Sequence, residues 1–260
     1  GSGVCDGAVL SLCNSDRTGY EEAETCSSAA LCLPGENAKC LAGGPALIDD
    51  VEDGDLAIIA QDGRAGGWGA AVESASDGLV SVVETTDRPG SLYAVRYQGS
   101  NFVEWGSELL ATLRPDLTST YDASDYAGIQ FWARRATPGK QARVILVDRF
   151  ALPEYGDCDE AGGTCYGYFG ADFELAQTWR LYQFTWEQLS QGFSPEHTEQ
   201  VDVSELVRVG FKFDVDQDLD VYIDDLAFIP RQTSGSCTAG DLRCSGPSLE
   251  RCVAAGDGWE

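Results

Sequence analysis

The pattern of apolar and polar positions between residues 45 and 231 is that of short β-strands. Segments such as "SLYAVRYQG", "AGIQFWARRA", "ARVILVDRF", "TWRLYQFTW" and "RVGFKFDV" are rich in β-branched and aromatic residues and are separated by Gly, Pro, Asp and Ser. Helical signals are limited to a turn or two, as in "EQLSQG" and "DVSELV". Many strands at this spacing, without a strand–helix–strand rhythm, predict an all-β fold, an antiparallel two-sheet β-sandwich.

The closing segment, "LDVYIDDLAFIP", carries two acids in the middle of a predicted strand. Alternation places Asp224 on one face with Tyr222, Leu226 and Phe228, and Asp225 on the other face. Neither face is polar. Burying a bare carboxylate costs several kcal/mol or forces it to take up a proton. We therefore expect a cationic partner for at least one of these acids.

The nearest counterpart of this strand is "ALIDDVEDGD" at the start of the same region. The first and last strands of a sandwich commonly lie side by side, and Ca²⁺ takes six to eight oxygen ligands. These observations predict a calcium site at Asp50, Glu52, Asp224 and Asp225, in which Asp50, Glu52 and Asp224 rank ahead of Asp225 and of the further candidate Asp49. The alternative is that the acids lie in water at strand ends or pair with Arg, because the spacing matches no EF-hand.

The charge and cysteine content limit the partners and the compartment. The chain has 17 Lys and Arg against 43 Asp and Glu, a net charge of -26, which disfavours nucleic acid and anionic membranes and favours neutral or cationic partners. No apolar run is long enough to cross a membrane, so no membrane insertion is expected. Ten cysteines with one His and no paired CxxC motifs predict disulfides rather than metal thiolates, and hence an extracellular or cell-surface location.

The cysteines fall into three groups, which predict three domains: 1–44, 45–231 and 232–260. The groups are Cys5, Cys13, Cys26, Cys32 and Cys40; Cys158 and Cys165; and Cys237, Cys244 and Cys252. "CDGAVLSLC" near the start and "CSGPSLERC" near the end share the pattern C-x-G-x-x-L-x-x-C, an internal repeat. If Cys158 pairs with Cys165, five cysteines remain in front and three behind. Full pairing then needs a bridge between the two arms, within one chain or between chains as in a homopolymer.

The order of the segments from "LIDDVEDGD" to "VYIDDLAFI" resembles that of carbohydrate-binding modules of the β-jelly-roll type, most closely family 11. The resemblance implies a jelly roll, a structural calcium between the terminal strands, a sugar-binding cleft on the concave sheet and no catalysis. The flanking repeats resemble the cysteine-rich repeats of large secreted proteins from myxobacteria. One departure is an insertion at residues 149–173, which could reshape or block the cleft.

Binding a sugar requires flat aromatic rings for the apolar faces of pyranoses and planar polar groups for the hydroxyls. If Ile129 and Phe131 face the core, their neighbours Gln130 and Trp132 face the other way, and the same alternation turns Lys212 outward. The candidate ligand-binding residues are Tyr97, Trp105, Trp132, Arg134, Asp148, Lys212 and Asp214. Aromatic residues in a sandwich of this size are also core residues, and this alternative carries nearly equal weight for each ring.

Two functions fit these features, and neither is an enzyme. The one His, His197, lies in a polar segment without a nucleophile motif nearby. The first hypothesis is non-catalytic binding of a neutral polysaccharide by a calcium-stabilised sandwich. The second is a structural subunit of an extracellular fibre or adhesin, joined through its cysteine-rich arms. An open groove lined by Trp132, Arg134 and Asp148 would favour the first, and a groove filled by the insertion would favour the second.

Overall fold

The computed structural model describes residues 3–6, 9–14, 19–25, 32–33, 39–40, 46–88, 90–116, 118–191, 200–231, 242–245 and 248–251. It divides into a β-sandwich, Ile48–Pro230, and a second unit that contains both arms, Gly1–Leu47 and Arg231–Glu260. The division into three domains, at 1–44, 45–231 and 232–260, stays a prediction. His197, Cys26, Cys237 and Cys252 lie outside the described residues. No helix in the described ranges is long and apolar enough to span a membrane.

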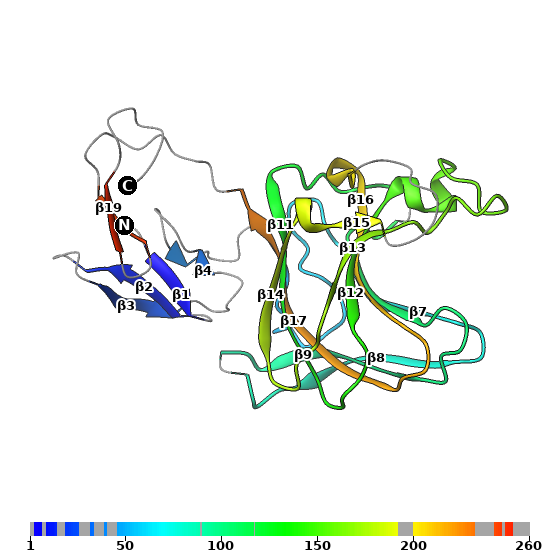
Figure 1. Cartoon of the computed structure of the whole chain (residues 1–260), viewed down its shortest axis with the longest axis horizontal. Helices are drawn as coiled ribbons and strands as arrows, with labels where there is room; N and C mark the ends of the chain where they lie inside the picture. The colour runs from blue at the N-terminus through cyan, green and yellow to red at the C-terminus, as the bar shows by residue number, and fades with distance from the viewer. Residues whose placement is uncertain are drawn as a thin grey trace. The chain divides into compact units, whose positions relative to one another are not determined.

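The sandwich consists of two sheets whose neighbouring strands run antiparallel, which confirms the predicted all-β fold (Figure 1). The six-stranded sheet has the order β15 (Ser190–Gln191), β13 (Phe169–Phe173), β12 (Ala142–Asp148), β16 (Leu206–Phe213), β10 (Ser107–Thr112) and β7 (Gly67–Val72). The other sheet has the order β14 (Arg180–Thr185), β11 (Tyr126–Arg135), β17 (Leu219–Pro230), β9 (Tyr93–Ser100) and β8 (Asp77–Glu84), and β6 (Leu47–Asp49) also pairs with β17. This second sheet is called the β11–β17 sheet below.

The arms contain short strands of their own, and the sandwich contains single helical turns. In the arms, β1 (Gly3–Asp6), β2 (Val9–Cys13) and β3 (Tyr20–Thr25) form one sheet, β4 (Cys32–Leu33) pairs with β5 (Lys39–Cys40), and β18 (Leu242–Ser245) pairs with β19 (Ser248–Arg251). The 3-10 turns η2 (Arg149–Ala151), η3 (Pro153–Tyr155), η4 (Trp186–Gln188) and η5 (Val203–Glu205) follow or precede strands of the sandwich. Two of them, η4 and η5, lie where the sequence indicated helical turns.

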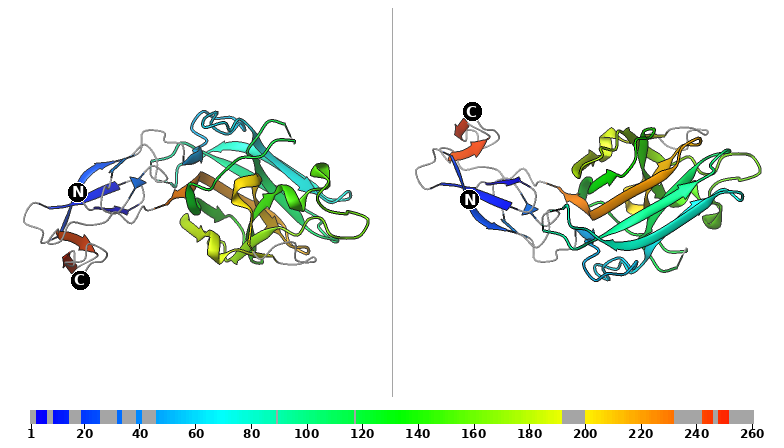
Figure 2. Two further views of the ribbon diagram at one scale, coloured as in Figure 1. Left: turned by 90° about the horizontal axis from the view of Figure 1, so that it is seen from above. Right: turned by 90° about the horizontal axis from the view of Figure 1, so that it is seen from below.

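Aromatic side chains from the facing sheets meet in the core. Phe131 of β11 packs edge-on against Phe211 of β16, with ring centroids 4.7 Å apart. Tyr97 of β9 lies 5.8 Å from Phe213 of β16. Each large apolar side chain that is fully buried contributes about 1.5–3 kcal/mol, so this interface is the main reason that the alternating segments fold as strands. The two views in Figure 2 show the strands of the sandwich from above and below.

The closing strand β17 contains a β-bulge at Asp225. The register pairs Gln130 with Ala227 and Trp132 with Asp224, so one residue of β11 faces two residues of β17. Asp225 has a backbone φ of 46°, in the left-handed region that a bulge residue often adopts. A bulge shifts the phase of the side chains by one position.

The bulge corrects the alternation expected for the closing strand. Asp224 shares the outer face with Tyr222, as predicted, but Leu226 and Phe228 do not lie on that face. Phe228 turns into the core, opposite Ile129, and its ring lies 4.7 Å from that of Tyr126. The two acids are therefore placed at the point where the strand changes phase, and this placement lets both carboxylates reach one partner.

Candidate functional site

The outer face of the six-stranded sheet carries a row of charged side chains that crosses four strands. The register pairs Glu108 of β10 with Lys212 of β16, Lys212 with Arg143 of β12, and Arg143 with Asp172 of β13. Their neighbours along each strand, such as Phe211, point into the core, so alternation directs all four outward. We call Glu108, Lys212, Arg143 and Asp172 the charged row.

The charged row is balanced by two ion pairs. Lys212 Nζ lies 3.4 Å from Glu108 Oε1, and Arg143 lies 3.1 Å from Asp172 Oδ1. Burial raises the pKa of Glu108, although the charge of Lys212 acts in the opposite direction. The two cations are direct neighbours across β16 and β12 with an acid on either side. The row therefore carries no net charge, and its exposure differs from end to end: Glu108 is buried, whereas the side chain of Asp172 is 60% exposed.

Trp105 lies beside Lys212 of the charged row. Its side chain belongs to a residue that is 39% exposed, and Lys212 Nζ lies 5.0 Å from its ring centroid. Glu73 holds the segment that carries this ring, because its carboxylate accepts hydrogen bonds of 2.8–3.2 Å from the backbone amides of Val103, Glu104, Trp105 and Gly106. Burial acts to raise the pKa of Glu73, but these amides bring it below its usual value. Trp105 is thus presented on an ordered loop.

The 149–173 insertion covers the part of this face that lies beyond the charged row. Its end, Phe169–Phe173, forms strand β13, so only the earlier part is an addition to the sheet. Side chains of that earlier part pack over the outward-facing apolar side chains of β10 and β12. The residues in contact are Leu110, Ile145 and Val147 of the sheet with Leu152, Tyr155 and Tyr168 of the insertion. The insertion therefore fills one half of the face and leaves the charged row beside it.

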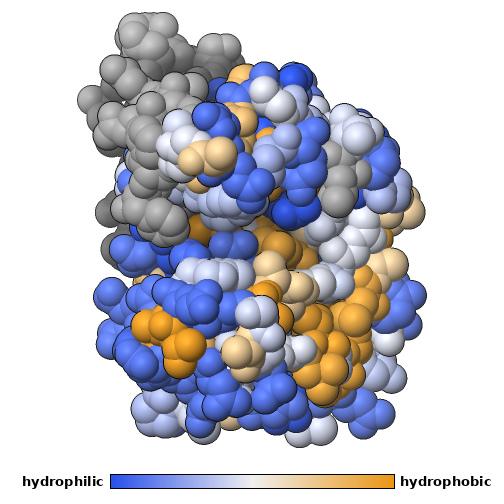
Figure 3. All heavy atoms as spheres, turned by 90° about the vertical axis from the view of Figure 1, so that its right-hand side faces the viewer, coloured by the Kyte–Doolittle hydropathy of each residue, from blue (hydrophilic) through white to orange (hydrophobic). Residues whose placement is uncertain are grey.

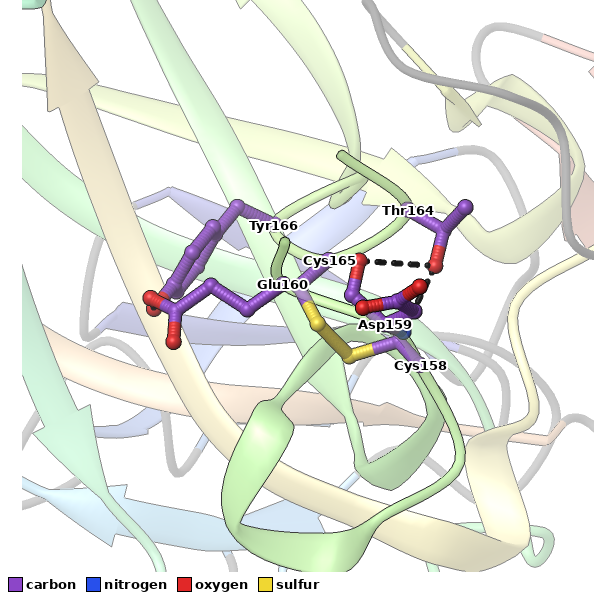
Figure 4. The surroundings of a disulfide bond; sticks show 6 residues. All are labelled: Cys158, Asp159, Glu160, Thr164, Cys165 and Tyr166. Carbon is purple, nitrogen blue, oxygen red and sulfur yellow. Dashed lines mark hydrogen bonds between the residues drawn. A yellow bond between two sulfur atoms is a disulfide. The ribbon is translucent and has the colours of Figure 1, made fainter. Parts of the chain in front are cut away.

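A disulfide closes the tip of the insertion. Cys158 and Cys165 are bonded, as predicted (Figure 4). Within this loop the Asp159 amide donates to Thr164 Oγ1 at 2.7 Å. The Tyr166 hydroxyl donates to Glu160 Oε1 at 2.6 Å, which ties the residue after the disulfide back onto the loop.

The space-filling view looks onto this side of the sandwich (Figure 3). The surface is hollowed between two rims, and hydrophobic residues are exposed along the hollow and below it.

Trp132 and Arg134, two of the expected ligand-binding residues, lie on the outer face of the other sheet. Alternation along β11 was predicted correctly, because Trp132 and Arg134 both point outward. Both side chains are in contact with other residues of the protein. The Arg134 guanidinium lies 3.9 Å from the Tyr222 ring centroid and 5.4 Å from that of Trp179. Arg88 lies 4.9 Å from the Trp132 ring centroid. These contacts cover the ring faces that a sugar would need.

The remaining expected residues divide between the core and the surface. Tyr97 lies two positions after Val95 on β9, so both side chains point to the same face of the strand, the core face. Tyr97 is therefore fully buried between the sheets and is not accessible to a ligand. Asp148 is buried at the end of β12 and accepts a hydrogen bond from the Asp202 amide at 3.3 Å. Asp214 is exposed just after β16. Because Asp148 and Trp132 belong to different sheets, the expected groove lined by Trp132, Arg134 and Asp148 is not formed.

The first and last strands of the sandwich meet, as predicted, since β6 pairs with β17. The cationic partner of both acids of β17 is Arg88, from the loop between β8 and β9. Arg88 donates to Asp224 Oδ2 at 2.5 Å and also to Asp225 Oδ2. Burial raises the pKa of Asp224 to about 8; the charge of Asp225 adds to this effect and Arg88 opposes it.

Two oxygen atoms of the early acidic segment accept hydrogen bonds within the protein. Glu52 Oε1 accepts from the Leu92 amide at 2.9 Å, and Asp50 Oδ1 accepts from the Glu52 amide at 3.4 Å. Within the described ranges, no three His, Cys, Asp or Glu side chains converge as metal ligands would. This arrangement does not fit a calcium cage of six to eight oxygens. Calcium binding at Asp50, Glu52, Asp224 and Asp225 stays a prediction.

Comparisons with known proteins relate the fold to carbohydrate-binding modules. No family model matches the sequence, and no curated protein matches it. A family 11 carbohydrate-binding module of a cellulosomal cellulase of Clostridium thermocellum is 13% identical, with a TM-score of 0.52 over 73% of this chain and 96% of that chain. A solution structure of CtCBM11 is 12% identical, with a TM-score of 0.52 over 74% and 99% of the two chains. The sandwich therefore has the jelly-roll fold of these modules.

The charged row itself was largely missed by sequence reasoning. Lys212 was expected to point outward, and it does, but Glu108, Arg143 and Asp172 were not singled out. Each is an ordinary polar position in an alternating strand. The signal that unites them is the pairing of four strands that are far apart in the sequence, and this pairing becomes visible only in the fold.

Proposed function

We propose that this protein binds a neutral polysaccharide, without catalysis, on the outer face of its six-stranded sheet. The observation that carries the proposal is the half-exposed Trp105 ring beside the charged row. A flat ring can cover the apolar face of a pyranose. The exposed Asp172 carboxylate and the partly exposed Arg143 and Lys212 can exchange hydrogen bonds with hydroxyls. The buried Glu108 pairs with Lys212 from below. The fold that the sandwich shares with carbohydrate-binding modules supports this proposal.

The charge of the face favours a neutral ligand. Glu108 is paired with Lys212, and Asp172 with Arg143, so neither cation is left to attract an anionic sugar. The net charge of the whole chain, -26, repels anions at long range. A neutral glycan avoids this repulsion and makes only hydrogen bonds and ring contacts.

The direction of the row sets the expected direction of the ligand. Strands in a sheet are about 4.8 Å apart, so the part of the row that reaches the surface, from Lys212 to Asp172, spans roughly 10 Å across the strands. Because the insertion covers the neighbouring half of the face, the ligand has to lie along the row and cannot spread over the sheet. We propose an extended glycan chain that crosses the strands.

The experiment is affinity electrophoresis and calorimetry against a panel of neutral polysaccharides. Trp105→Ala is expected to weaken binding at least tenfold, because stacking on an aromatic ring is worth on the order of 1.4 kcal/mol or more. Leu181→Ala is the matched control, since Leu181 is also 39% exposed but lies on β14 of the opposite sheet. Absence of binding at millimolar sugar, or equal losses in the two variants, would refute the proposal.

The covered half of the face favours a second candidate, a structural subunit of an extracellular fibre or adhesin. In this function the insertion completes the surface of a compact unit, and the cysteine-rich arms provide the joints. The Cys158–Cys165 disulfide suits an oxidising compartment, so both candidates imply an extracellular or cell-surface protein. The two candidates are compatible, and covalent multimers joined through the arms would support the second.

A further inference from the structure

Arg88 lies at the centre of the buried acid pair on the closing strand. Its side chain is 3% exposed, and those of Asp224 and Asp225 are 0% and 1% exposed. One terminal nitrogen of Arg88 donates to each carboxylate. Ser91, from the same loop, donates its hydroxyl to Asp224 Oδ2 at 2.7 Å. The loop between β8 and β9 thus fastens itself to β17 through three hydrogen bonds to buried carboxylates.

The bulge explains how two consecutive residues can share this partner. In a regular strand, the carboxylates of Asp224 and Asp225 would point to opposite faces of the sheet. The left-handed backbone of Asp225 removes that alternation, and the Asp225 amide donates to Asp224 Oδ1 at 2.7 Å. Both Oδ2 atoms then face the planar fork of one guanidinium. This geometry suits Arg in particular, because Lys offers a single nitrogen.

Two aromatic rings hold the guanidinium on the outer side. Its central carbon lies 4.9 Å from the ring centroid of Trp132 and 5.8 Å from that of Trp179. Rings at these distances attract a cation and keep water away from it. Trp132, expected as a sugar platform, therefore serves to enclose the cation of the seam.

We propose that Arg88 takes the place of a structural metal ion at the seam where the first and last strands meet. The Oδ2 atoms of both carboxylates of the closing strand are bound by a guanidinium, which already supplies the positive charge that an ion would bring. A guanidinium and a Ca²⁺ ion cannot occupy the same place. The sandwich therefore keeps its terminal strands together without calcium.

The first test is thermal unfolding of the full chain in EDTA and in millimolar calcium. We expect the same midpoint in both. A midpoint that rises in calcium and falls in EDTA would overturn the proposal and support the calcium site instead. This arm uses the unaltered protein, so it gives a result even where a variant does not fold.

The second test compares two arginine variants on the same sheet. Arg88→Met is expected to lower the midpoint by roughly 10 °C in both solutions, because two buried carboxylates lose their partner. Arg96→Met is the control: Arg96 also pairs with an acid, Asp220, but their side chains are 29% and 20% exposed, so its loss should be smaller. Equal losses in the two variants would contradict the role of Arg88.

A third variant separates charge from shape. The triple substitution of Arg88→Met, Asp224→Asn and Asp225→Asn removes the unpaired charges that Arg88→Met leaves behind. We expect it to recover part of the lost midpoint, since a buried polar group without charge costs less than a buried unpaired carboxylate. A triple variant that is less stable than Arg88→Met would show that the carboxylates contribute through something other than this ion pair.

Discussion

Asp49 is a buried acid whose surroundings favour its protonated form. It accepts hydrogen bonds from Trp68 Nε1 at 2.6 Å and from the Val51 amide at 3.1 Å. Burial nevertheless raises its pKa from an ordinary value of 3.8 to about 7. The folded protein therefore keeps a proton that the unfolded chain releases near pH 4. The contribution of Asp49 to the free energy of unfolding is therefore greatest below about pH 4 and is lost as the pH rises towards 7.

Asp49→Asn is expected to flatten this pH dependence. Asn has nearly the same shape, keeps an acceptor for Trp68 and does not ionise. The unaltered protein should lose up to about 4 kcal/mol between pH 4 and 7 through Asp49, as three pH units correspond to this free energy. Urea unfolding at several pH values measures the slope. The remaining slope should come from the other acids whose pKa burial raises, which are Asp50, Glu108, Asp148 and Asp224. An unchanged slope would count against the assignment to Asp49.

At the residue scale, sequence reasoning predicted the direction of side chains better than their partners. Trp132 and Lys212 point outward because strand alternation fixes the phase within one segment. The partners depend on which strands become neighbours, and the sequence of one segment holds no such information. Asp225 shows a further limit, because a bulge at a non-glycine residue leaves no local signal, yet it changes the face of every later residue in β17.

At the scale of elements, the loop that presents Trp105 depends on one acid of a neighbouring strand end. Glu73→Gln keeps the size of the side chain but replaces one acceptor oxygen with an NH₂ group that cannot accept a hydrogen bond. We expect a loss of about 1–3 kcal/mol in stability and faster amide exchange at residues 103–106. Hydrogen–deuterium exchange measures the second effect. Glu84→Gln, at an exposed position, is the control and should change neither quantity.

The insertion illustrates how an element can be both predicted and misread. Its position in the chain and its disulfide were visible in the sequence. Its last residues, however, extend the six-stranded sheet as β13. Its earlier part packs onto the outer face of that sheet through Leu152, Tyr155 and Tyr168. The sequence alone does not predict that these side chains contact Leu110 and Val147, because that contact depends on the position of β12 in the folded sheet.

The disulfide at the tip of the insertion should stabilise only its own loop. The side chains that anchor the insertion lie outside the segment closed by Cys158 and Cys165. Replacing both cysteines with Ser is therefore expected to raise amide exchange at residues 157–166 and to leave the exchange of β12 and β16 unchanged. Increased exchange in those strands would mean that the disulfide supports the whole covered face.

At the scale of the whole molecule, the two arms behave as parts of one unit. Residues 1–47 and 231–260 group together, apart from the sandwich. With Cys158 and Cys165 paired, five cysteines remain in front and three behind, so a bridge between the arms lets every cysteine pair within one chain. We expect a monomer on non-reducing gel electrophoresis that migrates more slowly after reduction. A ladder of multimers that collapses with reductant would favour the structural candidate.

The pairing of β6 with β17 also has a mechanical meaning. The polypeptide enters and leaves the sandwich at adjacent strands, so in a chain whose arms are not bridged a pulling force applied through both arms would act on that one strand pair. The charged row on β10, β16, β12 and β13 is not part of that strand pair, and a bridge between the arms would relieve the pair of the force.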